Sequence, residues 1–155
     1  MIVLVMGVAG VGKTTIGEAL AAALGARFID ADDYHPPQNV AKMKAGIPLQ
    51  DADRWPWLER LNQTLKSEPR AVLACSALKE SYRRRLSQGL QDFHVVYLHG
   101  TPELIRSRME TRRHRYMPAA LLDSQLATLE PPTDAIAIDV AAPLEASIAA
   151  IVARL

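Results

Sequence analysis

Apolar and polar positions alternate along the chain in blocks that predict five strands separated by helices. Apolar runs typical of buried strands span 2–6, 27–30, 70–75, 93–98 and 135–139. Between these runs, apolar residues recur at helical spacing over 13–24, about 36–45, 53–67, 78–89, 102–113, 118–128 and 143–154. Strands that alternate with helices form crossover units, so the pattern predicts an α/β fold with a parallel sheet and helices on both of its faces.

Residues typical of helix ends support these boundaries. Gly25 stands directly after the helical pattern of 13–24, where a left-handed residue ends many helices. Thr101-Pro102 and Pro143 open two later helices, because proline is tolerated in a first helical turn. We find no internal repeat, low-complexity segment or linker in the sequence, so we expect residues 1–155 to form a single domain.

The segment 7–14 is the most informative local pattern. It reads Gly-Val-Ala-Gly-Val-Gly-Lys-Thr between a predicted strand and a predicted helix, which is the context of a phosphate-binding loop. Its glycines leave backbone N–H groups bare for a polyphosphate, and the helix adds its positive end. We expect Lys13 to contact the β- and γ-phosphates and the Thr14 hydroxyl to hold Mg²⁺. The predicted nucleotide-binding residues here are Gly7, Val8, Ala9, Gly10, Val11, Gly12, Lys13, Thr14 and Thr15.

Composition narrows the class of protein. The chain has 155 residues, of which 49% are hydrophobic and 23% are charged, and its net charge is +1. A net charge near zero does not favour a nucleic-acid partner. No apolar stretch of the sequence is long enough to cross a bilayer. Cys75 is the only cysteine, which fits a reducing compartment and excludes an intramolecular disulfide. We find no leader pattern in the short apolar run 2–6, and we expect a cytoplasmic protein.

Three carboxylates follow the second predicted strand. Ligands bind beyond the carboxyl ends of the strands in such sheets, and Asp30 and Asp32 would face the same side of an extended segment. The third strand ends without an acid, so Asp30 and Asp32 are the nearest candidates for a second contact to Mg²⁺. We assign Asp32 to a substrate hydroxyl that it would orient for phosphoryl transfer. The alternative is an ordinary acidic turn or a helix cap before Pro36, which suffices for Asp33.

Basic residues lie near the starts of later predicted helices. Arg54, Lys79 and Arg83 would face the same cleft and could bind an anionic substrate, unless they are ordinary solvated charges. Five arginines also gather in 106–115, where they form either an RNA contact or a lid over the transferring phosphate. The near-zero net charge and the preceding phosphate loop favour the lid. We interpret Cys75 and Trp57 as packing residues.

Several further segments resemble the gluconate kinases, a branch of the small-molecule kinases with a phosphate-binding loop. The resemblance extends over nearly the whole chain. It rests on Asp30-Ala31-Asp32-Asp33-Tyr34-His35-Pro36, Asp53-Arg54 with Pro56-Trp57-Leu58, Cys75-Ser76-Ala77-Leu78-Lys79, Tyr82-Arg83 and 122–130. These segments are far more specific than the phosphate loop alone.

The resemblance implies a fold and an activity. The fold is a three-layer P-loop kinase with a five-stranded parallel sheet of order 2-3-1-4-5, a mobile lid at about 106–120 and a substrate-binding helical segment at about 34–60. The activity is transfer of phosphate from ATP, with Mg²⁺, to the 6-hydroxyl of D-gluconate. Family members are commonly homodimers.

The resemblance also implies roles for single residues. Lys13, Asp32 and Arg112 are the expected catalytic residues, and Asp30 is expected near the metal, together with Thr14. Arg108 is expected to lie against the nucleotide base. The expected substrate-binding residues are Asp32, His35, Arg54, Lys79 and Arg83, with Asp32 or His35 as acceptors for substrate hydroxyls.

Two points qualify this interpretation. The family usually has Arg-Lys-Gly-His-Phe in the lid, whereas this chain has Arg112-Arg113-His114-Arg115-Tyr116, so the glycine is gone and the histidine has moved by one place. The alternative substrates are another small sugar acid or a shikimate-like carboxylate. Shikimate kinases usually carry a glycine-rich turn after the third strand, where this chain has Ser76-Ala77-Leu78-Lys79, which counts against shikimate.

Overall fold

The fold alternates strands and helices as the sequence pattern predicts. The computed structural model describes residues 1–111 and 119–155. The strands are β1 (Ile2–Met6), β2 (Arg27–Asp30), β3 (Ala71–Ala74), β4 (Phe93–His99) and β5 (Ile136–Asp139). The helices are α1 (Lys13–Leu24), α2 (Pro37–Lys44), α3 (Asp51–Lys66), α4 (Glu80–Ser87), α5 (Pro102–Thr111), α6 (Ala119–Thr128) and α7 (Leu144–Arg154), with a 3-10 turn η1 (Ala31–Tyr34).

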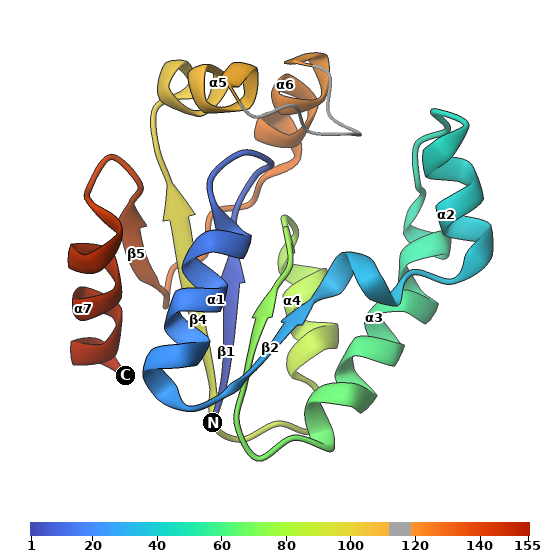
Figure 1. Cartoon of the computed structure of the whole chain (residues 1–155). Helices are drawn as coiled ribbons and strands as arrows, with labels where there is room; N and C mark the ends of the chain where they lie inside the picture. The colour runs from blue at the N-terminus through green and yellow to red at the C-terminus, as the bar shows by residue number, and fades with distance from the viewer. Residues whose placement is uncertain (112–118) are drawn as a thin grey trace.

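The five strands form one parallel sheet in the predicted order, β2-β3-β1-β4-β5. β1 lies at the centre, where Val5 pairs with Ala74 of β3 and Val96 of β4. All strands therefore end at the same edge of the sheet. The loop after β1, the turn after β3 and the α5–α6 pair lie at this carboxyl edge (Figure 1).

Two apolar cores, one on each face of the sheet, hold the helices in place. Val3 and Val5 of β1 face a core that also contains Ile16 and Leu20 of α1 and Ile151 of α7. The alternate residues of β1, Ile2, Leu4 and Met6, face a second core with Leu58, Leu61 and Leu65 of α3 and Leu86 of α4. This division follows from the two-residue period of a strand and produces three layers.

Predicted helix ends agree with the structure. Gly25 ends α1 with a left-handed backbone (φ 62°). The Thr101 hydroxyl accepts a hydrogen bond from the Leu104 N–H at 3.2 Å, which caps α5. Pro143 directly precedes α7.

The expectation of an extended segment over Asp30 and Asp32 is wrong. The strand ends at Asp30, and the next four residues form η1. The Asp30 carboxylate accepts a hydrogen bond from the Asp32 N–H at 3.0 Å. Such a local side-chain bond competes with extended backbone and explains the turn. Asp33 does not cap α2, whose N-cap is Pro36 without a side-chain bond.

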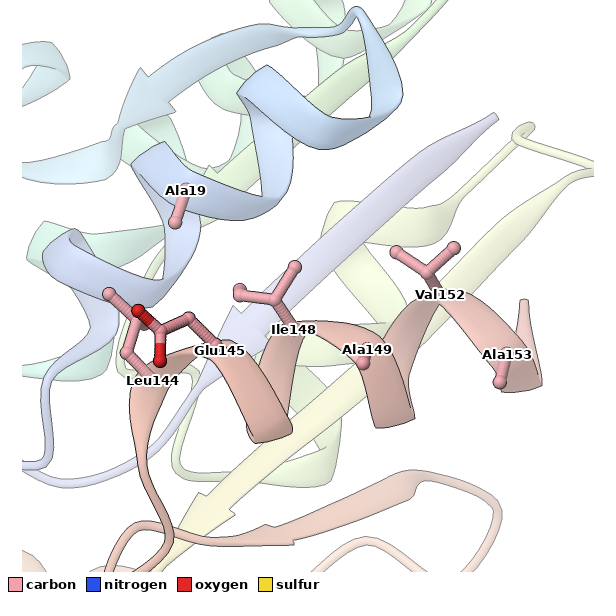
Figure 2. A pocket seen from close by; sticks show the side chains of 7 residues that line it. All are labelled: Ala19, Leu144, Glu145, Ile148, Ala149, Val152 and Ala153. Carbon is pink, nitrogen blue, oxygen red and sulfur yellow. The ribbon is translucent and has the colours of Figure 1, made fainter.

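Two further features concern the surface. No helix in the described ranges is long and apolar enough to cross a membrane. A shallow apolar groove runs between α1 and α7, lined by Ala19, Leu144, Glu145, Ile148, Ala149, Val152 and Ala153 (Figure 2). None of these residues belongs to the predicted nucleotide or substrate site.

Candidate active site

The loop between β1 and α1 has the backbone of an anion-binding site. Gly12 is the N-cap of α1 and has a left-handed backbone (φ 99°), which a side chain would strain. Gly10 (φ 81°) lies so close to α5 that a β-carbon there would overlap the Met109 side chain. Glycine is therefore required at both positions, and the N-terminus of α1 faces the carboxyl edge of the sheet.

Lys13 folds back over this loop. Its Nζ donates hydrogen bonds to the carbonyl oxygens of Gly7 at 3.0 Å and Val8 at 3.1 Å. Burial lowers the pKa of Lys13, and the nearby charges of Asp32 and Asp30 oppose this effect. The structure thus brings the predicted phosphate-binding lysine and the two predicted carboxylates into one electrostatic unit.

The pKa values of the Asp30 and Asp32 carboxylates differ from those of ordinary surface acids. Burial raises the pKa of Asp30, and its bond from the Asp32 N–H works in the opposite direction. Desolvation also raises the pKa of Asp32, although Lys13 partly offsets this. Both groups therefore lie in surroundings that favour a nearby cation or a proton.

The donors at this point fit a hard cation with few protein ligands. No group of three His, Cys, Asp or Glu side chains in residues 1–111 and 119–155 could hold a metal by itself. Mg²⁺ usually keeps waters and substrate phosphates among its ligands and needs only one or two carboxylates. Asp30 and the exposed Thr14 hydroxyl supply oxygen donors of the right kind.

Gln125 of α6 is a contact that the sequence reasoning missed. Its Oε1 accepts a hydrogen bond from the Ala9 N–H of the phosphate loop at 2.6 Å. The two residues are 116 positions apart in the chain, so no local pattern signals the contact. It ties α6 to the loop that is predicted to bind nucleotide.

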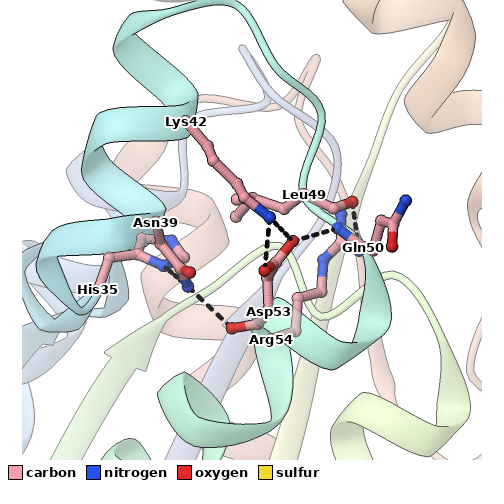
Figure 3. A network of polar contacts seen from close by, with 7 residues as sticks. All are labelled: His35, Asn39, Lys42, Leu49, Gln50, Asp53 and Arg54. Atoms are coloured by element: carbon pink, nitrogen blue, oxygen red, sulfur yellow. Dashed lines mark hydrogen bonds and ion pairs between the residues drawn. The ribbon is translucent and has the colours of Figure 1, made fainter.

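The segment from His35 to α3 is held by a polar network (Figure 3). The Lys42 ammonium lies 2.8 Å from the Asp53 carboxylate, which also accepts the Gln50 N–H at 2.9 Å and so caps α3. His35 stacks on Trp57 with ring centroids 4.1 Å apart. Burial, aided by the charge of Arg54, lowers the pKa of His35 to about 4, so its ring is neutral at physiological pH.

Two of the three predicted anion-binding cations meet around one carboxylate. Asp51 lies 3.5 Å from the Arg54 guanidinium and 3.8 Å from the Lys79 ammonium. The Tyr82 hydroxyl also donates to Asp51, and both cations lie over the Tyr82 ring. Burial and this bond raise the pKa of Tyr82 to about 12, so it remains a donor. Sequence reasoning assigned no role to Asp51 or Tyr82.

Arg83 is placed differently from Arg54 and Lys79. Its side chain is only 8% exposed, and its guanidinium donates to the carbonyl oxygens of Ala77 (2.7 Å), Leu78 (3.2 Å) and Glu130 (2.8 Å). Ala77 has a left-handed backbone (φ 45°), which is unusual for a residue with a side chain. Arg83 therefore supports the turn after β3, and its predicted contact with substrate stays a prediction.

Four predictions remain to be placed, for Arg108, Arg112, Cys75 and Trp57. Arg108 of α5 donates to the Val140 carbonyl at 2.6 Å, at the turn after β5. Arg112 and the altered lid sequence 113–116 lie outside the described residues. Cys75 and Trp57 are buried, as expected of packing residues, and burial raises the pKa of the Cys75 thiol to about 12.

Known proteins are similar to this chain in sequence and in fold. The family model described as shikimate kinase matches residues 9–130. The thermosensitive gluconokinase of Escherichia coli K12 is 46% identical over 145 residues, which cover 88% of this chain and 78% of that protein. The gluconokinase of Gluconobacter oxydans 621H is 47% identical over 134 residues, covering 84% and 75%.

A solved structure extends the comparison to three dimensions. The crystal structure of a gluconokinase from Sinorhizobium meliloti 1021 superposes with a TM-score of 0.88 at 44% identity, and covers 97% of this chain and 89% of that one. The fold, the phosphate loop and this level of identity agree, and the chain belongs to the gluconokinase family of P-loop kinases.

Proposed function

We propose that this protein transfers the γ-phosphoryl group of ATP to the 6-hydroxyl of D-gluconate, forming 6-phospho-D-gluconate and ADP. The observation that carries the proposal is the pairing of an acid with the lysine of the phosphate loop, together with a cluster of two cations around one carboxylate. Lys13 and Asp32 interact at the loop, and Arg54 and Lys79 meet at Asp51. Membership of the gluconokinase family supports the choice of substrate.

On the nucleotide side, backbone N–H groups of 10–15 bind the phosphates at the N-terminus of α1. The Lys13 ammonium contacts the β- and γ-phosphates, either by leaving its two carbonyl partners or through its third hydrogen. Its positive charge then offsets the negative charge of the transition state. Arg108 lies against the base, and Arg112 contacts the transferring phosphate. The Arg108 and Arg112 roles derive from the family resemblance.

On the alcohol side, Asp32 accepts a hydrogen bond from the 6-hydroxyl and orients its oxygen toward the γ-phosphorus. The new bond joins this oxygen to phosphorus, and the bond between the γ-phosphorus and the bridging oxygen breaks to release ADP. The hydroxyl proton passes to the Asp32 carboxylate. Because the transition state is loose, this carboxylate contributes mainly by orientation.

The carboxylate of gluconate binds at Arg54 and Lys79. These two cations share the Asp51 carboxylate, so the cluster carries about one positive charge and matches a monoanion. Arg54 can donate two parallel hydrogen bonds to a carboxylate, which fixes its direction as well as its position.

A magnesium ion would be held by the Thr14 hydroxyl and Asp30 together with phosphate oxygens. When bound, it supplies charge that stabilises the β- and γ-phosphates. We also propose a homodimer, as in related kinases, and a cytoplasmic location, which a single buried cysteine suits. Sedimentation of the purified chain would test the homodimer.

Substrate identity is tested by a coupled ADP-release assay over gluconate, other sugar acids and shikimate. We expect gluconate to give the highest kcat/KM. The match to the shikimate kinase family model makes shikimate the second candidate, and a clear preference for it would overturn the proposal.

The carboxylate anchor is tested by Arg54→Ala. We expect the KM for gluconate to rise about tenfold to a hundredfold, with little change in the KM for ATP, because a charged hydrogen bond is lost. Arg84→Ala, which removes an exposed arginine of α4 that pairs with Glu80, is the matched control. A raised KM for ATP with an unchanged KM for gluconate would show that the carboxylate anchor is assigned wrongly.

A further inference from the structure

Asn39 joins His35 to the start of α3 from a fully buried position. Its side chain is 1% exposed. Its Nδ2 donates to the Asp53 carbonyl oxygen at 2.9 Å and lies 3.3 Å from His35 Nδ1 (Figure 3). One amide nitrogen therefore contacts both the backbone of α3 and the imidazole ring.

The orientation of this amide is determined by its partner on α3. A carbonyl oxygen only accepts hydrogen bonds, so the nitrogen of Asn39 must face Asp53. The reversed orientation would place two acceptor oxygens against each other. Asn39 Oδ1 has no hydrogen-bond partner among residues 1–111 and 119–155, so no described contact favours reversal.

This orientation decides which nitrogen of His35 carries its proton. Nδ2 of an amide is only a donor, so Nδ1 of the ring must accept and carries no proton. The ring is neutral, because burial and Arg54 lower the pKa of His35 to about 4, and its single proton is left to Nε2. Stacking on Trp57, with an interplanar angle of 16°, fixes the plane of the ring.

We propose that Asn39 is a positioning residue that holds His35 as the neutral Nε2–H tautomer, and that His35 thereby donates a hydrogen bond to an oxygen of the acid substrate. This replaces the sequence-based expectation of His35 as an acceptor. Asp32 then accepts a hydrogen bond from a substrate hydroxyl, and His35 donates one to a substrate oxygen. The site therefore offers one acceptor and one donor, which fixes how the substrate is oriented. The tautomer follows from the contacts of Asn39, whereas the bond to the acid substrate rests on the proposed function.

The tautomer is measured directly by two-bond ¹H–¹⁵N correlation spectra of the full chain labelled at its histidine nitrogens. His35→Gln assigns the signal among the four histidines. We expect the pattern of a neutral ring protonated at Nε2 at pH 7. A ring protonated at Nδ1, or an imidazolium, would overturn the proposal whatever the enzyme phosphorylates.

A second variant tests the part played by Asn39. Asn39→Asp replaces the donor with a carboxylate, which should draw the His35 proton to Nδ1 and raise the KM for gluconate although His35 is present. Asn62→Asp is the matched control, because Asn62 is also buried and donates to two carbonyls, of Leu86 and Gln88, away from His35. Asn62→Asp should leave the tautomer unchanged. An unchanged tautomer in folded Asn39→Asp, or the same change in both variants, would contradict the proposal.

The donor role is tested without altering Asn39, in case that variant does not fold. The amide of glutamine can donate from near the position of Nε2, and that of asparagine from near Nδ1. We expect His35→Gln to keep the KM for gluconate within about threefold of wild type and His35→Asn to raise it about tenfold, as for loss of one hydrogen bond. The KM for ATP should not change. Equal effects of the two variants would overturn the donor role.

Discussion

The ammonium group of Lys13 lies where burial and charge act in opposite directions. Burial lowers its pKa, while Asp32 and Asp30 raise it, and its present partners are two carbonyl oxygens of the loop. A cation that is partly desolvated before substrate arrives interacts strongly with a phosphate, because little water must be displaced.

We therefore expect Lys13→Met to lower kcat/KM by about two to three orders of magnitude in the ADP-release assay. The variant should be at least as stable as wild type in thermal unfolding, because a desolvated charge has been removed. A large loss of stability together with activity would show that Lys13 is mainly structural.

Protonation of Asp32 should determine how kcat falls at low pH. Desolvation raises its pKa, so the carboxylate becomes protonated, and stops accepting a hydroxyl proton, at a higher pH than an ordinary aspartate. We expect kcat to fall as the pH drops through this raised value. Asp32→Asn should lower kcat more than it changes the KM for ATP, and should remove this fall at low pH. An unchanged fall in the variant would assign it to another group.

The sequence allowed prediction of site residues that belong to a local motif. Lys13 and Thr14 follow from a loop between a strand and a helix, and Arg54 and Lys79 from their places at helix starts. Gln125 could not be predicted, because its partner Ala9 is 116 positions away in the chain. The contacts of Asn39 are closer in sequence, but its burial is not visible in the sequence. The role of Arg83 was equally hidden, since a buried arginine and an exposed one look alike in a sequence.

At the scale of elements, the turn after β3 depends on one side chain. Arg83 donates to the carbonyls of Ala77, Leu78 and Glu130, and so joins this turn to the segment after α6. The N–H of Glu80 is capped by the Glu130 carboxylate at 2.9 Å, which strengthens the same junction. Lys79, at the N-cap of α4, is thereby placed beside Asp51.

Arg83→Lys should destabilise the protein by about 1–3 kcal/mol in urea unfolding, because a lysine cannot reach three carbonyls with a planar fork and leaves some of them unpaired. Ala77→Gly in the same background should recover part of the loss, since glycine adopts a positive φ without strain. If Arg83→Lys kept full stability and only raised the KM for gluconate, Arg83 would instead be a substrate ligand.

The contact between α2 and α3 has its own pH dependence. The bond from Lys42 holds the pKa of Asp53 below its usual range. Its contribution to stability is complete above the ordinary aspartate pKa of about 3.9 and is lost as the pH falls through the lower value of the folded state. Wild type and Lys42→Met should therefore differ in Tm at neutral pH and converge in acid. A constant difference would contradict this assignment.

Element boundaries were predictable wherever side chains repeat with a period. The strands and helices that the structure describes lie within a few residues of their predicted ranges. The exception is η1, where a bond from the Asp32 N–H to the Asp30 side chain turns the chain. The period of apolar residues carries no information about such a local bond, so the backbone between the two acids was wrongly expected to be extended.

For the whole molecule, the parallel order of the sheet brings the phosphate loop, the acids after β2 and the turn after β3 to one edge. Alternation of strands and helices predicts this class of fold, but strand order came from the family resemblance. A pattern of apolar residues does not specify which strand is the neighbour of which. It can separate the fully buried β1 and β3 from the more exposed β2, β4 and β5, but it does not pair them.

Nucleotide should stabilise the molecule as a whole. With MgATP at about a hundred times its Kd, we expect Tm to rise by about 5–10 °C. Lys13→Met should lose most of this rise, whereas Lys66→Met, which changes an exposed lysine at the end of α3, should keep it. No rise in either the wild type or the control would contradict nucleotide binding at this loop.

The alternation of β1 between two cores has a consequence for how this chain can vary. Substituting one of its five residues disturbs a single core. Deleting or inserting one residue would reverse the facing of every residue beyond it and shift the start of the phosphate loop along the sheet by about 3.3 Å. The length of this strand therefore sets the position of Lys13, and substitutions in the strand are tolerated far more readily than changes in its length.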